Sequence, residues 1–249
     1  MIIDTHCHVY DGEMENAEDI IKEALENDMC LILNGTDYKS NMQALELSEK
    51  YDNVYAALGY FHTLADEISE GDICLLDEQL DGDNVVAVGE IGLDYYHTKE
   101  NKDIQIELFE RMLNLAEKHD LPVIVHSRKA MQDTFDILKR HDVSGSLHCY
   151  QGSAEMAQQF IKLGFYIGVG GPITHSGNKK TVKTIKTIDI NHILVETDSP
   201  YLAPEEKMGE INTPHNIMYV IKKIAEELDI TEDEVIDKTT ENAKRLFKI

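Results

Sequence analysis

Histidine and acidic residues stand at the ends of several apolar runs in this 249-residue sequence. The first run, MIIDTHCHVY, carries His6 and His8 one residue apart. Side chains at positions i and i+2 of a strand point to the same side, so these two imidazoles can reach one ion together. Imidazoles and carboxylates are common ligands of divalent metal ions. The sequence therefore predicts a metal centre whose candidate ligands are His6, His8, Glu90, His126, His148 and Asp198.

The number of candidate ligands favours more than one ion. Four imidazoles and two carboxylates exceed the three protein ligands typical of a single catalytic zinc. We therefore expect two adjacent divalent ions per chain, with one carboxylate between them. Because the set has nitrogen and oxygen donors without a thiolate, magnesium, manganese and zinc all remain open. Cys7, between the two histidines, points the other way and is expected to pack in the core.

A second pair with the same spacing occurs in VETDSP, as Glu196 and Asp198. Asp198 is nearer the strand end, so it is the better candidate for a ligand and a general base. Glu196 lies one pleat deeper and has two interpretations: it supports a ligand, or it is a buried carboxylate paired elsewhere. Asp4 stands in the same relation to His6, and both interpretations apply to it as well.

The elements that position these residues are short apolar runs separated by helical segments. Several runs are nearly continuous in Val, Ile, Leu and Ala, which is typical of strands buried on both faces of a parallel sheet. Between two of them, residues 101–120 place Ile104, Leu108, Met112 and Leu115 on one helical stripe. Residues 153–164 predict another helix, with Ser153 as its N-cap and Gly164 as its end. The predicted strands are residues 1–6, 29–35, 54–61, 85–92, 122–127, 145–150, 165–171 and 192–198.

Strand–helix alternation repeated through the whole sequence predicts an α/β fold, a (β/α)₈ TIM barrel forming one domain over residues 1–249. A doubly wound open sheet is the alternative, but it ordinarily has a glycine-rich first turn, and the first turn here reads DTHCHVYDGE. In such a barrel the chemistry gathers at the C-terminal ends of the strands. The candidate ligands stand at five of these ends.

Composition limits the class of protein. The net charge is −24, from 23 basic and 47 acidic residues, and this field repels polyanions at long range. It does not exclude a nucleic-acid substrate, because bound metal ions change the local charge. Four cysteines without a C-x-x-C pair favour reduced thiols in the cytoplasm. We expect no transmembrane helix, no signal peptide and no membrane partner, and no obligate protein partner is evident.

Six motifs resemble those of the TatD family of metal-dependent hydrolases, in the same order and over residues 4–247. They are DTHCH, GEIGLDYY, PVIVHSRKA, LHCYQGS, ETDSPYLAP and TTENAKRLF. The resemblance implies a TIM barrel of the amidohydrolase-like superfamily with a one- to three-metal site. It also implies magnesium-dependent deoxyribonuclease activity from the 3′ end of DNA. The same six residues are then the metal ligands, with Glu90 bridging and Asp198 orienting the attacking water.

Two stretches depart from the family pattern. After the third predicted strand the family usually has a glycine followed by a His-Pro pair, whereas this sequence reads GYFHTLAD. Phe61 stands at the expected histidine, and His62, one place later, becomes the candidate substrate contact. Near residue 211 the family tends to have an Arg-Asn-Glu-Pro cluster. The stretch EINTPHN matches it only at Asn212 and Pro214, so a basic contact is missing.

These residues predict hydrolysis of phosphodiester bonds in DNA by a metal-activated water, with Glu90 and Asp198 as the catalytic pair. Arg128 is a candidate phosphate contact, because a guanidinium matches that geometry bidentately. The alternative is a divalent-metal hydrolase of a small ester, lactone, amide or phosphoester, since the fold does not fix the substrate. The net charge and the missing arginine favour it slightly. A third hypothesis, a non-catalytic metal-binding protein, is disfavoured because all six ligands are present.

Overall fold

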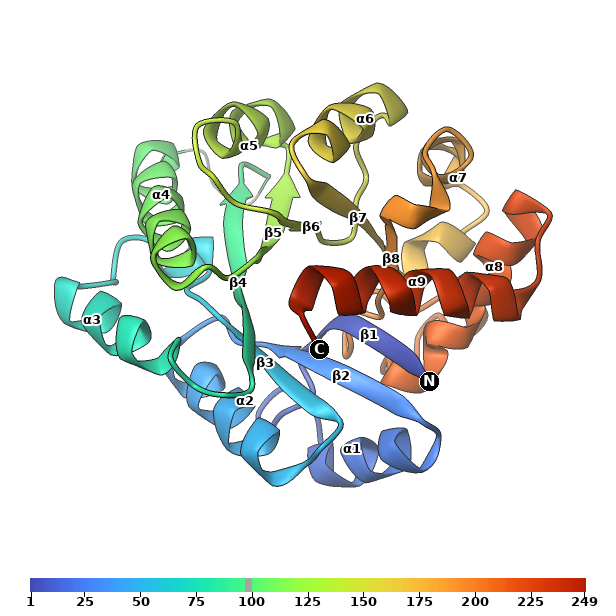
Figure 1. Ribbon diagram of the computed structural model, residues 1–249, viewed down its shortest axis with the longest axis horizontal. Coiled ribbons are helices and arrows are strands. Elements are labelled where there is room, and N and C mark those ends of the chain that lie inside the picture. The colour runs from blue at the N-terminus through green and yellow to red at the C-terminus, as the bar shows by residue number, and fades with distance from the viewer. Residues whose placement is uncertain (97–99) are drawn as a thin grey trace.

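The computed structural model describes residues 1–96 and 100–249, and in them eight parallel strands form one sheet in the order β1 to β8. The sheet curves into a barrel with helices around it (Figure 1). The predicted (β/α)₈ barrel is confirmed, and every predicted strand matches an observed one. The strands are β1 (Ile2–Cys7), β2 (Met29–Asn34), β3 (Val54–Leu58), β4 (Val85–Asp94), β5 (Val123–Arg128), β6 (Gly145–Leu147), β7 (Phe165–Val169) and β8 (Ile193–Val195).

The helices follow the strands along the chain and cover the outside of the barrel (Figure 1). None of the helices in the described ranges is long and apolar enough to cross a membrane. The α-helices of the described ranges are α1 (Ala17–Glu26), α2 (Tyr38–Lys50), α3 (Glu70–Gln79), α4 (Lys102–His119), α5 (Met131–Leu138), α6 (Ala154–Lys162), α7 (Lys179–Ile185), α8 (Ile217–Leu228) and α9 (Glu232–Phe247).

Two helices test the predicted patterns. In α6, Ser153 is the N-cap, because its side chain accepts a hydrogen bond from the backbone N–H of Met156 at 3.2 Å. Gly164, with φ at +90°, lies just beyond the helix end. In α4 the predicted stripe is wrong at one position: Ile104 is 41% exposed, whereas Gln105 is fully buried. The helix turns Gln105 inward because its amide bonds the backbone of β4, an interaction that apolar periodicity does not reveal.

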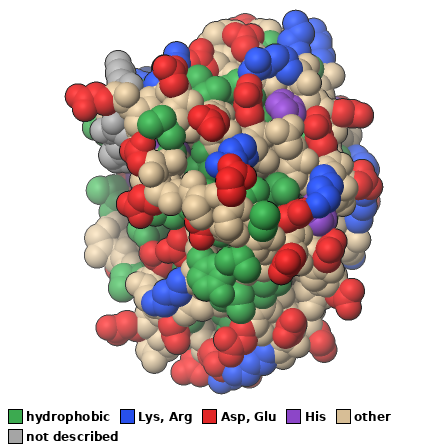
Figure 2. All heavy atoms as spheres, turned by 90° about the vertical axis from the view of Figure 1, so that its left-hand side faces the viewer, with side chains coloured by type: hydrophobic (Ala, Val, Ile, Leu, Met, Phe, Trp, Pro, Cys, Tyr) green, Lys and Arg blue, Asp and Glu red, His purple; other side chains and the backbone are tan. Residues whose placement is uncertain are grey.

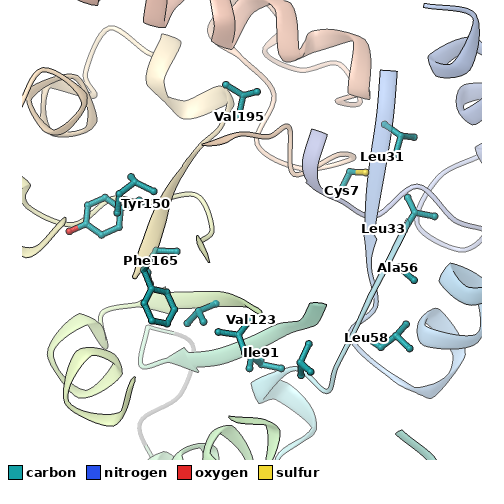
Figure 3. Packing of buried hydrophobic residues seen from close by; sticks show 14 of the residues in the cluster. Cys7, Leu31, Leu33, Ala56, Leu58, Ile91, Val123, Tyr150, Phe165 and Val195 are labelled. Carbon is teal, nitrogen blue, oxygen red and sulfur yellow. The ribbon is translucent and has the colours of Figure 1, made fainter. Parts of the chain in front are cut away.

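The core lies mainly between the sheet and the surrounding helices. Figure 3 shows part of it, with Cys7 from β1 beside Leu31 and Leu33 of β2. Cys7 is fully buried, and its thiol donates to the backbone carbonyl of Ile32 at 3.6 Å. The prediction that Cys7 packs in the core is therefore confirmed.

A smaller apolar cluster fills the barrel near the N-terminal ends of the strands. It joins inward-facing residues such as Ile3, Ile32 and Leu194 to Leu246 and Phe247 at the end of α9. Figure 1 shows α9 lying across the strands beside β1 and β8. The last helix therefore closes one end of the barrel, and the candidate ligands lie at the other end.

The barrel closes where β8 meets β1, and individual hydrogen bonds join the two strands there. The backbone N–H of Asp198 donates to the carbonyl of His6 at 2.9 Å, and that of His8 donates to Ser199 at 2.7 Å. The carboxylate of Asp4 accepts from the backbone and the hydroxyl of Thr197, at 2.9 and 2.5 Å. Burial raises the pKa of Asp4 to about 7. Asp4 thus joins the first and last strands beneath the ligands.

Acidic side chains are spread over the outer surface. Figure 2 shows this for the side that faces left in Figure 1, where Asp and Glu side chains are scattered among fewer Lys and Arg side chains. The distribution agrees with the net charge of −24. On this face the acidic side chains are not confined to one patch.

Candidate metal centre

The six candidate ligands converge at the C-terminal end of the barrel, from five strands. His6 lies in β1 and His8 just after it, Glu90 lies in β4, and His126 lies in β5. His148 directly follows β6, and Asp198 follows β8. The side chains are almost completely buried, except that 18% of the His126 side chain and 10% of the Asp198 side chain are exposed. Polar residues this deeply buried require partners, and here they face one another.

One ligand group consists of His6, His8, Glu90 and Asp198. The Nε2 atoms of the two histidines are 3.2 Å apart. Each of these atoms is 3.5 Å from Glu90 Oε2 and 3.5 Å from Asp198 Oδ1. Two donors that share one ion through bonds of about 2.0–2.2 Å lie about 3.0–3.5 Å apart. The spacing of these four donors therefore fits a divalent ion placed among them.

The second ligand group consists of Glu90, His126 and His148. Glu90 Oε1 is 3.1 Å from His126 Nδ1 and 3.7 Å from His148 Nε2, and the three donor atoms are close enough to hold one ion. The two oxygens of Glu90 thus face two different pairs of imidazoles. This arrangement fits the expectation that Glu90 bridges two ions. The centre has enough donor atoms to hold both of them.

In two of the histidines, the ring nitrogen that points away from the ligand group, Nδ1, lies beside a hydrogen-bond acceptor. His8 Nδ1 lies 2.8 Å from the carbonyl of Asn34, and His148 Nδ1 lies 3.1 Å from Glu196 Oε1. An acceptor at Nδ1 keeps the proton there and leaves Nε2 free to bind an ion. Glu196 also accepts from the backbone N–H of Cys149 at 2.5 Å. Of its two interpretations, support of a ligand is the one that this geometry fits.

The electrostatic coupling within the centre is strong in the absence of an ion. Burial by itself lowers the pKa of His148, but the carboxylates of Glu196 and Asp198 raise it to about 10. Burial by itself raises the pKa of Glu90, but His6 and His126 hold it well below the usual range. Glu90 therefore stays ionised. A cluster that stabilises positive charge in this way suits cations.

A cleft of about 1080 Å³ opens above the ligands. Arg128 lines it, and its guanidinium carbon lies 4.0 Å from the centre of the Tyr96 ring. Phe61 also lines the cleft, whereas His62 is 2% exposed and faces Asp94, with its Nε2 3.9 Å from Asp94 Oδ2. The structure therefore places Arg128 within reach of a substrate and His62 beneath the cleft wall. A substrate contact by His62 stays a prediction.

Sequence reasoning missed two features of the site. Asp94, 1% exposed, has its Oδ2 3.5 Å from His126 Nε2. Its position four residues after Glu90, in the same buried run GEIGLDYY, was the available signal. The second is a hydrogen bond from the Tyr201 hydroxyl to Glu13, which joins the segments after β8 and β1 at the cleft. No spacing rule connects residues so far apart in the chain.

Comparison with known proteins gives the family. A family model described as TatD related DNase matches residues 3–248. A relative from Bacillus subtilis (strain 168), "Uncharacterized metal-dependent hydrolase YabD", is 40% identical over 256 residues and covers 100% of both chains. The crystal structure of YjjV, a TatD homologue from Escherichia coli K12, has a TM-score of 0.93 at 32% identity, over 100% of this chain and 98% of that one.

A more distant match shows how widely the fold extends. The crystal structure of an uncharacterized amidohydrolase from Saccharomyces cerevisiae has a TM-score of 0.79 over 99% of this chain and 100% of that one. Its identity is 19%, so the likeness shows the shared barrel alone. With the family model over nearly the whole sequence and the buried ligand groups, the chain belongs to the TatD family of metal-dependent hydrolases.

Proposed function

We propose that this hydrolase cleaves phosphodiester bonds of single-stranded DNA from the 3′ end, and that His6, His8, Glu90, His126, His148 and Asp198 hold two divalent ions. The observation that carries the proposal is the position of Glu90, whose two oxygens face two separate imidazole pairs. A pair of adjacent ions suits in-line displacement at phosphorus, because both the attacking and the leaving oxygen need stabilisation. The matching family model, described as TatD related DNase, supports the same substrate.

Asp198 is suited to accept the proton of the attacking water. It lines the cleft, and its Oδ1 lies 3.5 Å from both His6 and His8. Burial by itself raises the pKa of Asp198, but His148 and His8 outweigh that effect and hold it below the usual value. The carboxylate is therefore ionised and able to take a proton. When bound, the divalent ions lower the pKa of a water and neutralise charge on the phosphate.

Arg128 and Lys180 are suited to contact the phosphates of the strand. Both line the cleft, together with Lys129. The Arg128 side chain lies over Tyr96, which holds the guanidinium at the wall and leaves its edge for a phosphate. Phe61 offers a face on which a base can stack, as is common for proteins that bind single strands.

The test uses a single strand labelled at its 3′ end, with magnesium or manganese added. We expect stepwise release of nucleotides from that end, complete loss of activity with chelator, and complete loss in His126→Ala. The matched control is His141→Ala, because His141 is bonded to Glu117 away from the cleft and its removal leaves the centre intact. Full-length, uncut DNA after incubation of metal-loaded, folded wild-type protein would contradict the proposal.

A small phosphoester, ester, lactone or amide is the second candidate substrate. Two observations favour it: the net charge of −24, and the carboxylate of Glu13 at the cleft, which repels a long polyanion. A panel of p-nitrophenyl phosphates, diesters and esters measured beside DNA separates the candidates. Higher kcat/KM on a small ester than on DNA would transfer the proposal to that class.

A further inference from the structure

We propose that Asp94 is a positioning residue: it orients His126 and so selectively supports the ligand group Glu90, His126 and His148. The inference rests on the proposed metal centre and deepens it. Asp94 lies at the end of β4, four residues beyond Glu90, and is almost completely buried. Its motif, GEIGLDYY, supplies Glu90 as a ligand, and the mechanism above gives Asp94 no part.

The imidazole of His126 lies between two carboxylates of the same strand. Its Nδ1 is 3.1 Å from Glu90 Oε1, and its Nε2 is 3.5 Å from Asp94 Oδ2. A neutral imidazole carries one proton, and an acceptor beside one nitrogen holds the proton there. When an ion takes the lone pair of Nδ1, the proton of His126 is on Nε2, and Asp94 Oδ2 is the carboxylate oxygen beside that nitrogen. His8 and His148 use the opposite nitrogen, so His126 needs a support of its own.

Asp94 is itself fixed by neighbouring groups. The backbone N–H of Tyr96 donates to its Oδ1 at 2.7 Å. The buried amide of Gln105 on α4 accepts from the backbone N–H of Asp94 at 3.0 Å and donates to its carbonyl at 3.1 Å. The backbone of Asp94 is thus held by Gln105 and one carboxylate oxygen by Tyr96, which restricts the orientation of the side chain. Its other oxygen, Oδ2, faces the imidazoles of His126 and His62.

The close approach of β4 and β5 brings Asp94 to His126. Gly92, with φ at +137°, pairs with His126 in the sheet, and a Cβ on Gly92 would lie 2.1 Å from the backbone oxygen of His126. Only glycine permits this contact. The His126 side chain is also the most exposed of the six candidate ligands, at 18%. Packing alone therefore confines it least, and its orientation depends most on a polar partner.

His62 faces the same oxygen of Asp94 as His126 does, which gives an alternative explanation for the burial of Asp94. Its Nε2 is 3.9 Å from Asp94 Oδ2, and its ring is stacked on that of His126 with the centroids 5.5 Å apart. If Asp94 served only to balance the buried His62, its loss would alter folding stability and leave the two ligand groups equally affected. The positioning role instead predicts an effect confined to one ion.

The experiment titrates metal-free protein with Mn²⁺ and follows binding by calorimetry, without any DNA. We expect two ions per wild-type chain. In Asp94→Ala one ion should bind about 10–100-fold more weakly, the usual effect of removing a carboxylate behind a histidine ligand, while the other ion keeps its affinity. In Asp94→Asn the loss should be smaller, because the amide oxygen still accepts from Nε2–H. Electron paramagnetic resonance reports whether the spin coupling of paired ions disappears with the weakened one.

Asp103→Asn is the matched control, because Asp103 is an exposed carboxylate on the same helix as Gln105, and it should bind both ions like wild type. If Asp94→Ala does not fold, Asp94→Asn carries the test. Unchanged binding of both ions, or an equal loss of both, would overturn the inference. A wild-type chain that binds no metal would overturn the proposed centre as well. If both ions bind as expected but the protein does not cut DNA, only the proposed DNA substrate would be overturned.

Discussion

At the scale of residues, the candidate ligands could be predicted because each is a histidine or an acidic residue within or soon after an apolar run, where burial alone disfavours such a group. His126 and Asp198 stand out in this way in the printed sequence. Asp94 could not be given a role, because its role depends on an imidazole in the next strand. That contact arises from the register of β4 with β5, which pairs Gly92 with His126. A single sequence contains no direct record of such a register.

Glu196 provides a prediction at this scale. Glu196→Gln keeps the size of the side chain but removes the charge that faces His148 Nδ1. We expect metal affinity to fall about 10–100-fold, as for other carboxylates behind a histidine ligand, which equilibrium titration with Mn²⁺ measures. Glu155→Gln, at an exposed position of α6, should bind metal like wild type. Unaltered affinity in Glu196→Gln would show that the charge is dispensable.

At the scale of elements, the places of the strands were predictable, whereas several predicted strand ends run past the observed ones, as at β3, β6 and β8, and one face of a helix was predicted wrongly. The apolar pattern of α4 predicted Ile104 inward, but Gln105 is buried because its amide satisfies the backbone of β4. A hydrogen bond that caps a neighbouring strand can therefore decide which face of a helix turns inward. The closure of β8 onto β1 was likewise hidden, since it depends on Asp4 and Thr197, which stand 193 positions apart.

Asp4→Ala tests this closure. The substitution leaves the buried donors of Thr197 without their acceptor, and each such loss costs about 1–3 kcal/mol. We expect the free energy of unfolding to fall by about that amount, measured by urea denaturation of metal-free protein. Asp4→Asn should lose less, because its amide oxygen can still accept from the backbone N–H. Equal stability of Asp4→Ala and wild type would mean that the strands close without this carboxylate.

At the scale of the whole molecule, the two ends of the barrel have different tasks. The candidate metal ligands lie at one end, and the apolar cluster of α9 fills the other. Conserving the packing at one end and the chemistry at the other is typical of TIM barrels. The family match over residues 3–248 includes both ends. Changes at the packed end should therefore alter stability without altering the site.

Phe247→Ala tests this division. Phe247 is 3% exposed and packs in the cluster with Ile3 and Ile32, so its truncation should lower the free energy of unfolding by about 3–5 kcal/mol. Metal affinity at a temperature where the variant is folded should equal that of wild type. Thermal denaturation and calorimetry check the two parts. A loss of affinity in the folded variant would mean that the two ends are coupled.

The net charge of −24 leads to a prediction about salt. Among the described residues, the cations that line the cleft are Arg128, Lys129 and Lys180, which are few beside the 47 acidic residues of the sequence. Long-range repulsion of DNA should therefore dominate association, and salt screens it over a Debye length of about 10 Å at 0.1 M. We expect kcat/KM on DNA to rise as monovalent salt increases from low concentration, the reverse of a basic nuclease. Steady-state rates over a salt series, beside an uncharged ester as control, measure this trend. A steep fall for DNA alone would contradict it.

The contact between the segments after β8 and β1 has a consequence for synthesis on the ribosome. His6 and His8 leave the exit tunnel long before Asp198 is made, because seven strands are made between them. The backbone bonds of His8 to Ser199 and of Asp198 to His6 form later still, when the last strand reaches the first. A nascent chain therefore carries His6 and His8 while all the strands from β2 to β8 are made, before Asp198 exists. The intact four-donor group is among the last parts of the molecule to assemble, so a truncated product lacks it.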